Sequence, residues 1–220
     1  MRRVFRPAHA AAPESYTPTV AELDEARKRF LEYEPRDLFY RVASELIELA
    51  LTGKTSITVA EALAVLLQTW NKAFYQFTTR FDKKHFSDIE HVLRKRRHAL
   101  LLLRHRAIST FSDTDRSTVE ALFADFEHVL GAVGAAKSLH LLAPHFFPLW
   151  DRAIAKAYSL ALGKRGSNSD RYCRFMTIAQ EQYRSLRSRR RANWNPLKAI
   201  DEYNYCKHTR HGRPPFSLET

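Results

Sequence analysis

Asp151 and two glycines, Gly131 and Gly134, are the residues whose types and spacing could do chemistry in this chain. Asp151 follows Pro148-Leu149-Trp150 at an expected helix start, where its carboxylate could cap free backbone amides. An aspartate is normally ionised at neutral pH, so Asp151 could instead stabilise a cation that forms beside it or activate a water molecule. The glycines either end a helix and permit close packing, or let backbone N–H groups converge on a phosphate.

Two segments of the sequence resemble the helix-hairpin-helix (HhH-GPD) DNA glycosylases. Leu130-Gly131-Ala132-Val133-Gly134 is similar to their hairpin, with Gly134 on the last hairpin glycine. Phe147–Lys156 is similar to their catalytic segment: Asp151 falls on the catalytic aspartate, Ile154 on the following aliphatic position and Lys156 on the basic one. The hairpin lacks the usual proline, and Arg152-Ala153 replace the commoner threonine-histidine pair. The resemblance therefore indicates a divergent member.

The resemblance implies an enzyme that flips a modified or damaged base out of DNA and cleaves its N-glycosidic bond. Asp151 would stabilise the sugar cation and then activate the nucleophile. Lys137 lies near the position where some members carry a lysine that forms a Schiff base with the sugar, and in that role it would add lyase activity. Otherwise Lys137 contacts phosphate or lies on a solvated helix face. The divergence leaves both DNA repair and phage defence open.

A flipped base must be held by stacking and by hydrogen bonds to its edge. The candidate pocket residues are aromatic or polar side chains from two segments: Trp70, Asn71, Lys72, Tyr75 and Trp150. The helical spacing of Trp70, Phe74 and Phe77 favours a stripe of core residues, so Asn71 and Lys72 are the stronger candidates for the pocket.

The charge balance indicates a polyanionic partner. The chain has 36 Lys and Arg against 24 Asp and Glu, a formal net charge of +12, and a basic domain is typical of proteins that bind nucleic acid. Basic residues cluster at 94–97, 104–106 and 187–191, either as solvated faces or as a phosphate track. The predicted DNA-contacting residues are Gly131, Gly134, Arg152, Lys156, Arg96, Arg97, Arg189 and Arg190.

Other classes of protein receive no support. No long apolar run or signal segment occurs, so we expect a soluble, cytoplasmic protein. The two cysteines, Cys173 and Cys206, lack the spacing of zinc or iron–sulfur ligands and are expected to be reduced thiols. No metal or other cofactor is predicted.

Helix signals recur along the chain with almost no alternating strand pattern, so the predicted fold class is all-α. Capping boxes predict four helix starts, at Thr19–Glu22, Thr58–Glu61, Ser87–Glu90 and Ser117–Glu120. Leu38, Val42, Leu46 and Ala50 recur every four residues and predict the buried face of a helix between Pro35 and Gly53.

We therefore expect a two-lobed helical bundle. Residues 1–17 would be a flexible basic arm, and 18–220 one glycosylase-like domain with a helix-hairpin-helix element at about 120–162. The expected partner is duplex DNA, bound by a monomer without an obligate protein partner or a membrane. One alternative is a non-catalytic module that binds DNA or RNA, in which Asp151 only caps its helix. Another is an interaction protein for an acidic protein partner.

Overall fold

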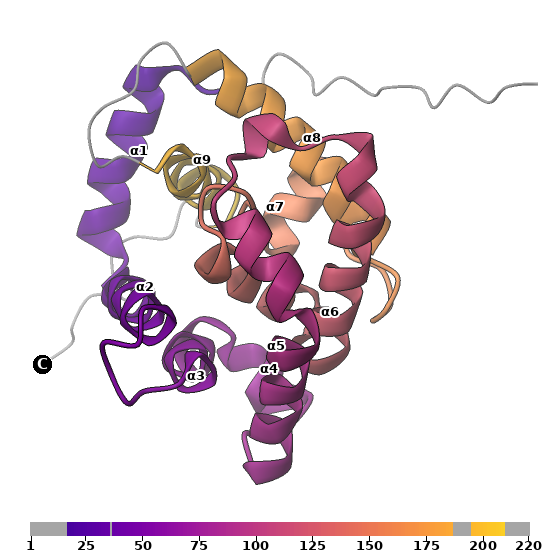
Figure 1. The fold of residues 1–220 in the computed structure, drawn as a ribbon. Coiled ribbons are helices and arrows are strands. Elements are labelled where there is room, and N and C mark those ends of the chain that lie inside the picture. The colour runs from indigo at the N-terminus through magenta and orange to yellow at the C-terminus, as the bar shows by residue number, and fades with distance from the viewer. Residues whose placement is uncertain (1–16, 36, 187–194, 210–220) are drawn as a thin grey trace, which may run out of the picture.

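The computed structural model describes residues 17–35, 37–186 and 195–209. These residues form helices and connecting loops without any strand, which confirms the all-α class (Figure 1). The α-helices are α1 (Val20–Tyr33), α2 (Asp37–Leu51), α3 (Val59–Trp70), α4 (Lys72–Phe77), α5 (Lys83–Arg104), α6 (Asp113–Leu142), α7 (Arg152–Ala157), α8 (Ser169–Leu186) and α9 (Pro196–Asn204). A 3-10 turn, η2 (Ile108–Thr110), precedes α6, and a π-helical turn, η4 (Tyr205–Thr209), continues α9.

Local capping chemistry sets most helix starts. The first two predicted capping boxes are confirmed, at Thr19–Glu22 and Thr58–Glu61. The starts expected at Ser87 and Ser117 are wrong, because α5 and α6 begin several residues earlier. Asp82 accepts a hydrogen bond from the His85 N–H at 2.8 Å and caps α5, while Ser112 forms the capping box of α6. Each upstream cap already satisfies the free amides, so the later serine lies inside the helix.

Buried apolar side chains form two clusters that share α8. The larger cluster includes Leu63, Phe123 and Phe175, and the smaller one contains residues of α1, α8 and α9, such as Leu23 and Ile200. Helices α1 and α9, from opposite ends of the chain, pack side by side (Figure 1). No helix among the described residues is long and apolar enough to cross a membrane. The division into two lobes stays a prediction, and residues 1–16 of the predicted arm lie outside the described part.

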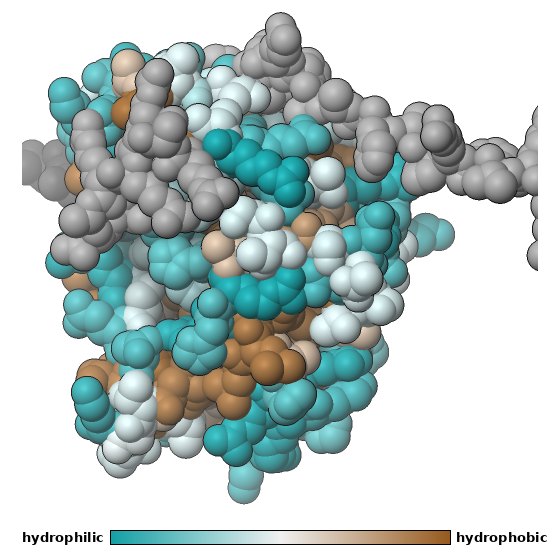
Figure 2. All heavy atoms as spheres, turned by 45° about the horizontal axis from the view of Figure 1, so that its top comes forward, coloured by the Kyte–Doolittle hydropathy of each residue, from teal (hydrophilic) through white to brown (hydrophobic). Residues whose placement is uncertain are grey.

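The predicted buried face of α2 is wrong at Leu38 and Val42, whereas Leu46 packs partly buried against the core. Leu38 and Val42 are 55% and 38% exposed, whereas Ala43 and Ile47 are buried. The buried side of α2 instead carries Ala43 and Ile47, flanked by the partly buried Tyr40 and Leu51. The helix therefore keeps a hydrophobic face at helical spacing, and Asp37 at its start is buried with its Oδ1 3.3 Å from the Lys198 ammonium. On the face seen in Figure 2, hydrophobic residues gather in a band bordered by hydrophilic ones.

Gly131 puts a sharp kink into α6, close to the helix end predicted there. Its φ of 69° and ψ of 167° fall in a region that is essentially restricted to glycine. The Asn71 amide donates to the Leu130 carbonyl at 3.0 Å and replaces a helical hydrogen bond lost at the kink. The helix-hairpin-helix element itself stays a prediction.

We predict that Gly131→Ala lowers the free energy of unfolding by about 2–3 kcal/mol, because strain at this φ and ψ adds to a steric clash. A Cβ at Gly131 would lie 3.1 Å from two ring carbons of Phe74. Gly53→Ala is the control: it has a similar φ of +67° but nothing within 4 Å, so its cost should be about 1 kcal/mol. Urea denaturation measures both, and equal losses would contradict the role of the Phe74 contact.

Candidate functional site

Asp151 lies directly before α7 and uses its two carboxylate oxygens differently. Oδ1 accepts a hydrogen bond from the Ile154 N–H at 2.8 Å, so the expected helix cap is present. Oδ2 accepts a hydrogen bond from the Thr209 hydroxyl at 3.0 Å, on the π-helical turn. Asp151 is half-buried. Capping therefore engages one oxygen and leaves the other facing a hydroxyl that a ligand could displace.

Asp151 lines a small cavity of about 60 Å³, called here the central pocket. Its walls come from segments far apart in the sequence: Phe30, Glu34, Trp70, Lys137, Trp150, Asp151, Asp201 and Tyr205. The structure thus brings together both predicted catalytic residues, Asp151 and Lys137, and two of the predicted base-pocket residues, Trp70 and Trp150.

Lys137 reaches the central pocket from the second half of α6. Its ammonium donates a hydrogen bond to the Trp70 carbonyl oxygen and lies 5.6 Å from the centre of the Trp70 ring. A cation over an indole face is electrostatically favourable. Trp70 therefore holds the Lys137 amine in position on one wall of the pocket.

A buried ion cluster lies next to the central pocket and centres on Lys198, which is 5% exposed. The Lys198 ammonium is 3.3 Å from Asp37, 3.5 Å from Asp201 and 3.4 Å from Glu202. Burial disfavours the charged amine, but the three carboxylates outweigh it and raise the pKa of Lys198. The cluster thus keeps Lys198 protonated and places its carboxylates around a fixed positive charge.

Asp201 belongs both to this cluster and to the wall of the central pocket. Burial raises the pKa of the Asp201 carboxyl to about 6; Lys198 opposes that rise and the nearby charge of Asp151 adds to it. Lys137 also lowers the pKa of Asp201. Asp151, Lys137 and Asp201 therefore form one electrostatically coupled group. A carboxyl that titrates near 6 can exchange a proton close to physiological pH.

Two tryptophans provide the aromatic walls of the central pocket. Trp70 stacks on Tyr40 with ring centres 5.4 Å apart. Trp150 is 1% exposed and stacks on Phe175 at 5.9 Å, so it is also a core residue. Its indole Nε1 is buried and meets no hydrogen-bond acceptor within the described residues. This N–H is a donor that a bound ligand could satisfy.

A wider groove of about 790 Å³, called here the basic groove, adjoins the central pocket, since Trp70 and Asp151 line both. Arg152, Lys156 and Arg165 supply its positive charge, and its apolar lining includes Phe74, Phe77, Leu130, Val133 and Leu162. The predicted residues Asn71 and Gly131 also line it. Asp151 therefore lies where a small pocket adjoins a basic groove.

Phe77 lies on the wall of the basic groove and is 85% exposed. The expected core stripe of Trp70, Phe74 and Phe77 is therefore wrong at its last member. The reason is a break at Asn71, whose φ of −114° and ψ of 26° separate α3 from α4. Helical spacing does not continue across this break, and α4 has no buried residue.

Asn71 and Gly134 have a packing role at the kink of α6. Asn71 is 6% exposed, and its amide nitrogen would lie 2.5 Å from a Cβ at Gly134. Only a glycine at 134 allows Asn71 to reach the Leu130 carbonyl. One amide hydrogen of Asn71 is thus already engaged.

Lys72 and Tyr75 line neither the central pocket nor the basic groove. Lys72 is exposed at the start of α4. Tyr75 packs edge-on against Phe81, with ring centres 5.6 Å apart, and its hydroxyl lies 3.2 Å from His85 Nε2. The structure does not bring these two candidates to the proposed pocket.

The predicted DNA contacts are distributed over several surfaces. Arg152 and Lys156 line the basic groove. Arg96 lies on α5 and pairs with Asp125 at 2.7 Å, and Arg97 is exposed on the same helix; neither lines the groove. Arg189 and Arg190 lie outside the described residues.

No protein-family model matches the chain, and neither curated proteins nor solved structures give a significant match. Within the described ranges, no group of three His, Cys, Asp or Glu side chains could hold a metal ion. Cys173 is buried, Cys206 is half-buried, and both are free thiols. The functional assignment depends on the geometry of this chain and on the resemblance of its two short segments.

Sequence reasoning missed the contribution of α9 to the site. Lys198, Asp201 and Glu202 recur at i, i+3 and i+4 beside the apolar residues Leu197 and Ile200. Charged residues at that spacing share one helix face, and their apolar neighbours indicate that the face is partly buried. That signal could have predicted an internal ion cluster, although not its position next to Asp151.

We predict that Asp201→Asn changes the pH dependence of stability. The folded-state pKa of about 6 exceeds the ordinary value of about 3.9, so the wild type loses stability as the pH rises from about 4 through 6. The variant lacks this titration, so its stability relative to the wild type should rise by about 3 kcal/mol over that range. Denaturant unfolding at several pH values measures the difference, and a constant difference would contradict the raised pKa.

Proposed function

We propose that this protein is a DNA N-glycosylase with Asp151 as its catalytic carboxylate. One observation carries the proposal: Asp151 lines both a small pocket with aromatic walls and a groove with three basic side chains. A strand in the groove would place its phosphates near Arg152, Lys156 and Arg165. A nucleotide flipped from that strand would turn its base toward Trp70 and Trp150, and its sugar toward Asp151.

In the proposed reaction, the bond between the sugar carbon and the base nitrogen breaks and its electron pair leaves with the base. The Asp151 carboxylate stabilises the resulting sugar cation. A water molecule attacks the sugar carbon and transfers a proton to a carboxylate, for which Asp201 is suited, since its pKa of about 6 makes it mainly ionised at neutral pH. The products are the free base, after it takes up a proton, and an abasic site.

Lys137 is the candidate for a second activity. Its amine lines the same pocket as Asp151, and attack by a neutral amine on the sugar carbon would give a Schiff base that leads to strand cleavage. Alternatively, the hydrogen bond to the Trp70 carbonyl keeps Lys137 as a positive charge that orients Asp201. The first case defines a bifunctional enzyme and the second a monofunctional one.

A bound base requires the central pocket to expand. Its present volume of about 60 Å³ has room for only a few water molecules. The wall formed by η4 is held by hydrogen bonds from Tyr205 to Glu34 at 2.5 Å and from Thr209 to Asp151 at 3.0 Å. We propose that a nucleotide displaces the Thr209 hydroxyl from Asp151 as it enters.

Phe77 fits this proposal as a stacking contact. Exposed aromatic side chains next to basic groups can stack on bases or insert between them, and Phe77 is 85% exposed on the wall of the groove. Its apolar surface would be covered when DNA occupies the groove.

The second candidate function is a non-catalytic helical module that binds nucleic acid. It is favoured by the cap that Asp151 Oδ1 provides to the Ile154 amide, which by itself would explain an aspartate at this position. In either case the proposed partner is DNA bound by a monomer, and the proposed location is the cytoplasm. The role in repair or in phage defence depends on the base that is removed.

We predict that Asp151→Asn reduces base release by at least about a hundredfold, because an amide cannot stabilise the sugar cation as a carboxylate does. Asparagine still caps a helix well, so folding and DNA binding should persist. The assay incubates the protein with oligonucleotides that carry different modified bases and detects abasic sites as strand breaks in hot alkali. Asp113→Asn, an exposed first-turn position of α6, is the matched control and should act as wild type.

A wild type that binds these oligonucleotides but yields no abasic product from any of them would overturn the enzymatic assignment in favour of the binding module. On an active substrate, sodium borohydride distinguishes the roles of Lys137. A covalent adduct that disappears in Lys137→Gln identifies a lyase, and unchanged base release by that variant without any adduct identifies a monofunctional enzyme. We also expect base release to fall as the pH decreases below about 6, where Asp201 becomes protonated.

A further inference from the structure

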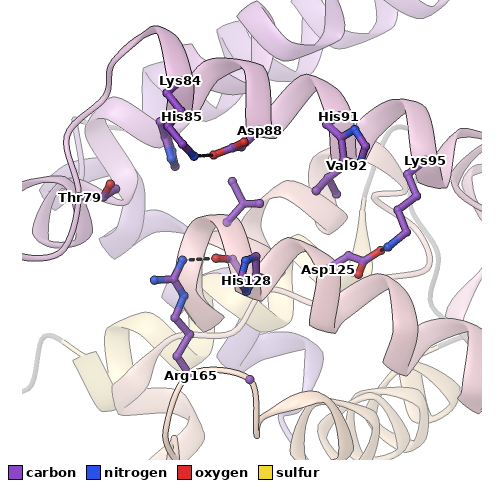
Figure 3. A pocket seen from close by; sticks show the side chains of 12 residues that line it. Thr79, Lys84, His85, Asp88, His91, Val92, Lys95, Asp125, His128 and Arg165 are labelled. Atoms are coloured by element: carbon purple, nitrogen blue, oxygen red, sulfur yellow. Dashed lines mark hydrogen bonds and ion pairs between the residues drawn. The ribbon is translucent and has the colours of Figure 1, made fainter.

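A cavity of about 730 Å³ lies between α5, α6 and the loop before α8, and we call it the histidine pocket (Figure 3). The side chains that matter for its charge are Lys84, His91, Lys95, His128 and Arg165. Lys84, His91 and Lys95 project from one face of α5, since they recur with helical spacing. His128 comes from α6 and Arg165 from the loop, so the basic and imidazole groups converge from three elements.

The acidic residues of the histidine pocket are already neutralised. Asp88 pairs with Lys84 at 2.9 Å. Asp125 pairs with both Lys95 and Arg96, at 2.8 and 2.7 Å. Among the lining residues these pairs balance the charge of both lysines, so Arg165 supplies the net positive charge, and Arg96 lies beside the pocket at Asp125. His91 and His128 are exposed and supply N–H donors.

Arg165 connects the histidine pocket to the basic groove, because it lines both. Its guanidinium donates hydrogen bonds to the backbone carbonyls of Glu127, at 3.3 Å, and His128, and it lies 5.8 Å from the centre of the Phe74 ring. These contacts hold Arg165 in a fixed position on the boundary between the two cavities. A polyanion that follows the groove would therefore meet a continuous path of positive charge.

We propose that the histidine pocket binds backbone phosphates of DNA that extends beyond the basic groove. This inference rests on the proposed function, and it adds a second contact surface away from Asp151. Imidazole and guanidinium N–H groups hydrogen-bond to phosphate oxygens. Contacts of this kind position the duplex without reading its sequence. The pocket would hold the flanking DNA while the base turns into the central pocket.

The test uses the full chain with the double substitution His91→Glu/His128→Glu, at two exposed positions. The control is His98→Glu/His105→Glu, with the same charge change at exposed positions of α5 and its end, outside the pocket. Fluorescence anisotropy measures binding of an unmodified duplex over a series of salt concentrations. The pocket variant should bind about tenfold more weakly, and its salt slope should decrease by about 1 for each lost phosphate contact. The control should stay within about twofold of wild type.

The outcomes separate this proposal from the proposed function. If the pocket variant binds as wild type does while Arg152→Glu/Lys156→Glu binds weakly, the histidine pocket is not a phosphate site and the proposed function stands. If the pocket variant loses affinity but wild type releases no base from any substrate, the pocket proposal stands and the glycosylase assignment fails. If wild type does not bind duplex DNA at all, both are overturned.

Discussion

The structure depends on one buried positive charge. Lys198 lies among Asp37, Asp201 and Glu202 and is also 4.1 Å from the centre of the Phe30 ring. Removing one partner of a buried ion pair typically costs about 3–5 kcal/mol, because the remaining charges stay desolvated and unpaired. Lys198 therefore fixes α9 against α2. Lys198 also pairs with the buried Asp37 at the start of α2 and with Asp201 at the wall of the central pocket.

The helix cap at Asp151 is compatible with chemistry at the same residue. The Ile154 amide fixes the orientation of the carboxylate through Oδ1, and a fixed orientation lets a charged group stabilise a transition state without reorganising during the reaction. The aspartate that starts α7 is also the residue where the central pocket meets the basic groove. A residue with a local structural role thus becomes the strongest candidate for catalysis through its tertiary surroundings.

Features encoded over a few residues could be predicted from the sequence, and features created by tertiary packing could not. The caps at Thr19 and Thr58 and the glycine at the kink of α6 depend on neighbouring residues, so they were predicted. The face of α2 that is buried depends on packing against residues far away in the chain, and Asp37 at its start pairs with Lys198. Phe77 is exposed because the helical path breaks at Asn71, between α3 and α4. The side chain of Asn71 hydrogen-bonds to the Leu130 carbonyl at the kink of α6. In the site, Asp151 and Lys137 come from motif-like segments, whereas Asp201 joins them only because α9 packs there.

In the π-helical turn η4, the loop closed by each hydrogen bond contains one residue more than in an α-helix. This extra residue determines the direction of the Thr209 side chain at the end of the turn. Successive residues of an α-helix are rotated by about 100° around the axis. Deleting a single residue between 205 and 209 would allow α9 to continue as an ordinary helix and would swing the final hydroxyl away from its carboxylate partner. The contact between Thr209 and Asp151 therefore depends on the number of residues in η4. Single-residue insertions or deletions in this turn should disturb the site more than many substitutions would.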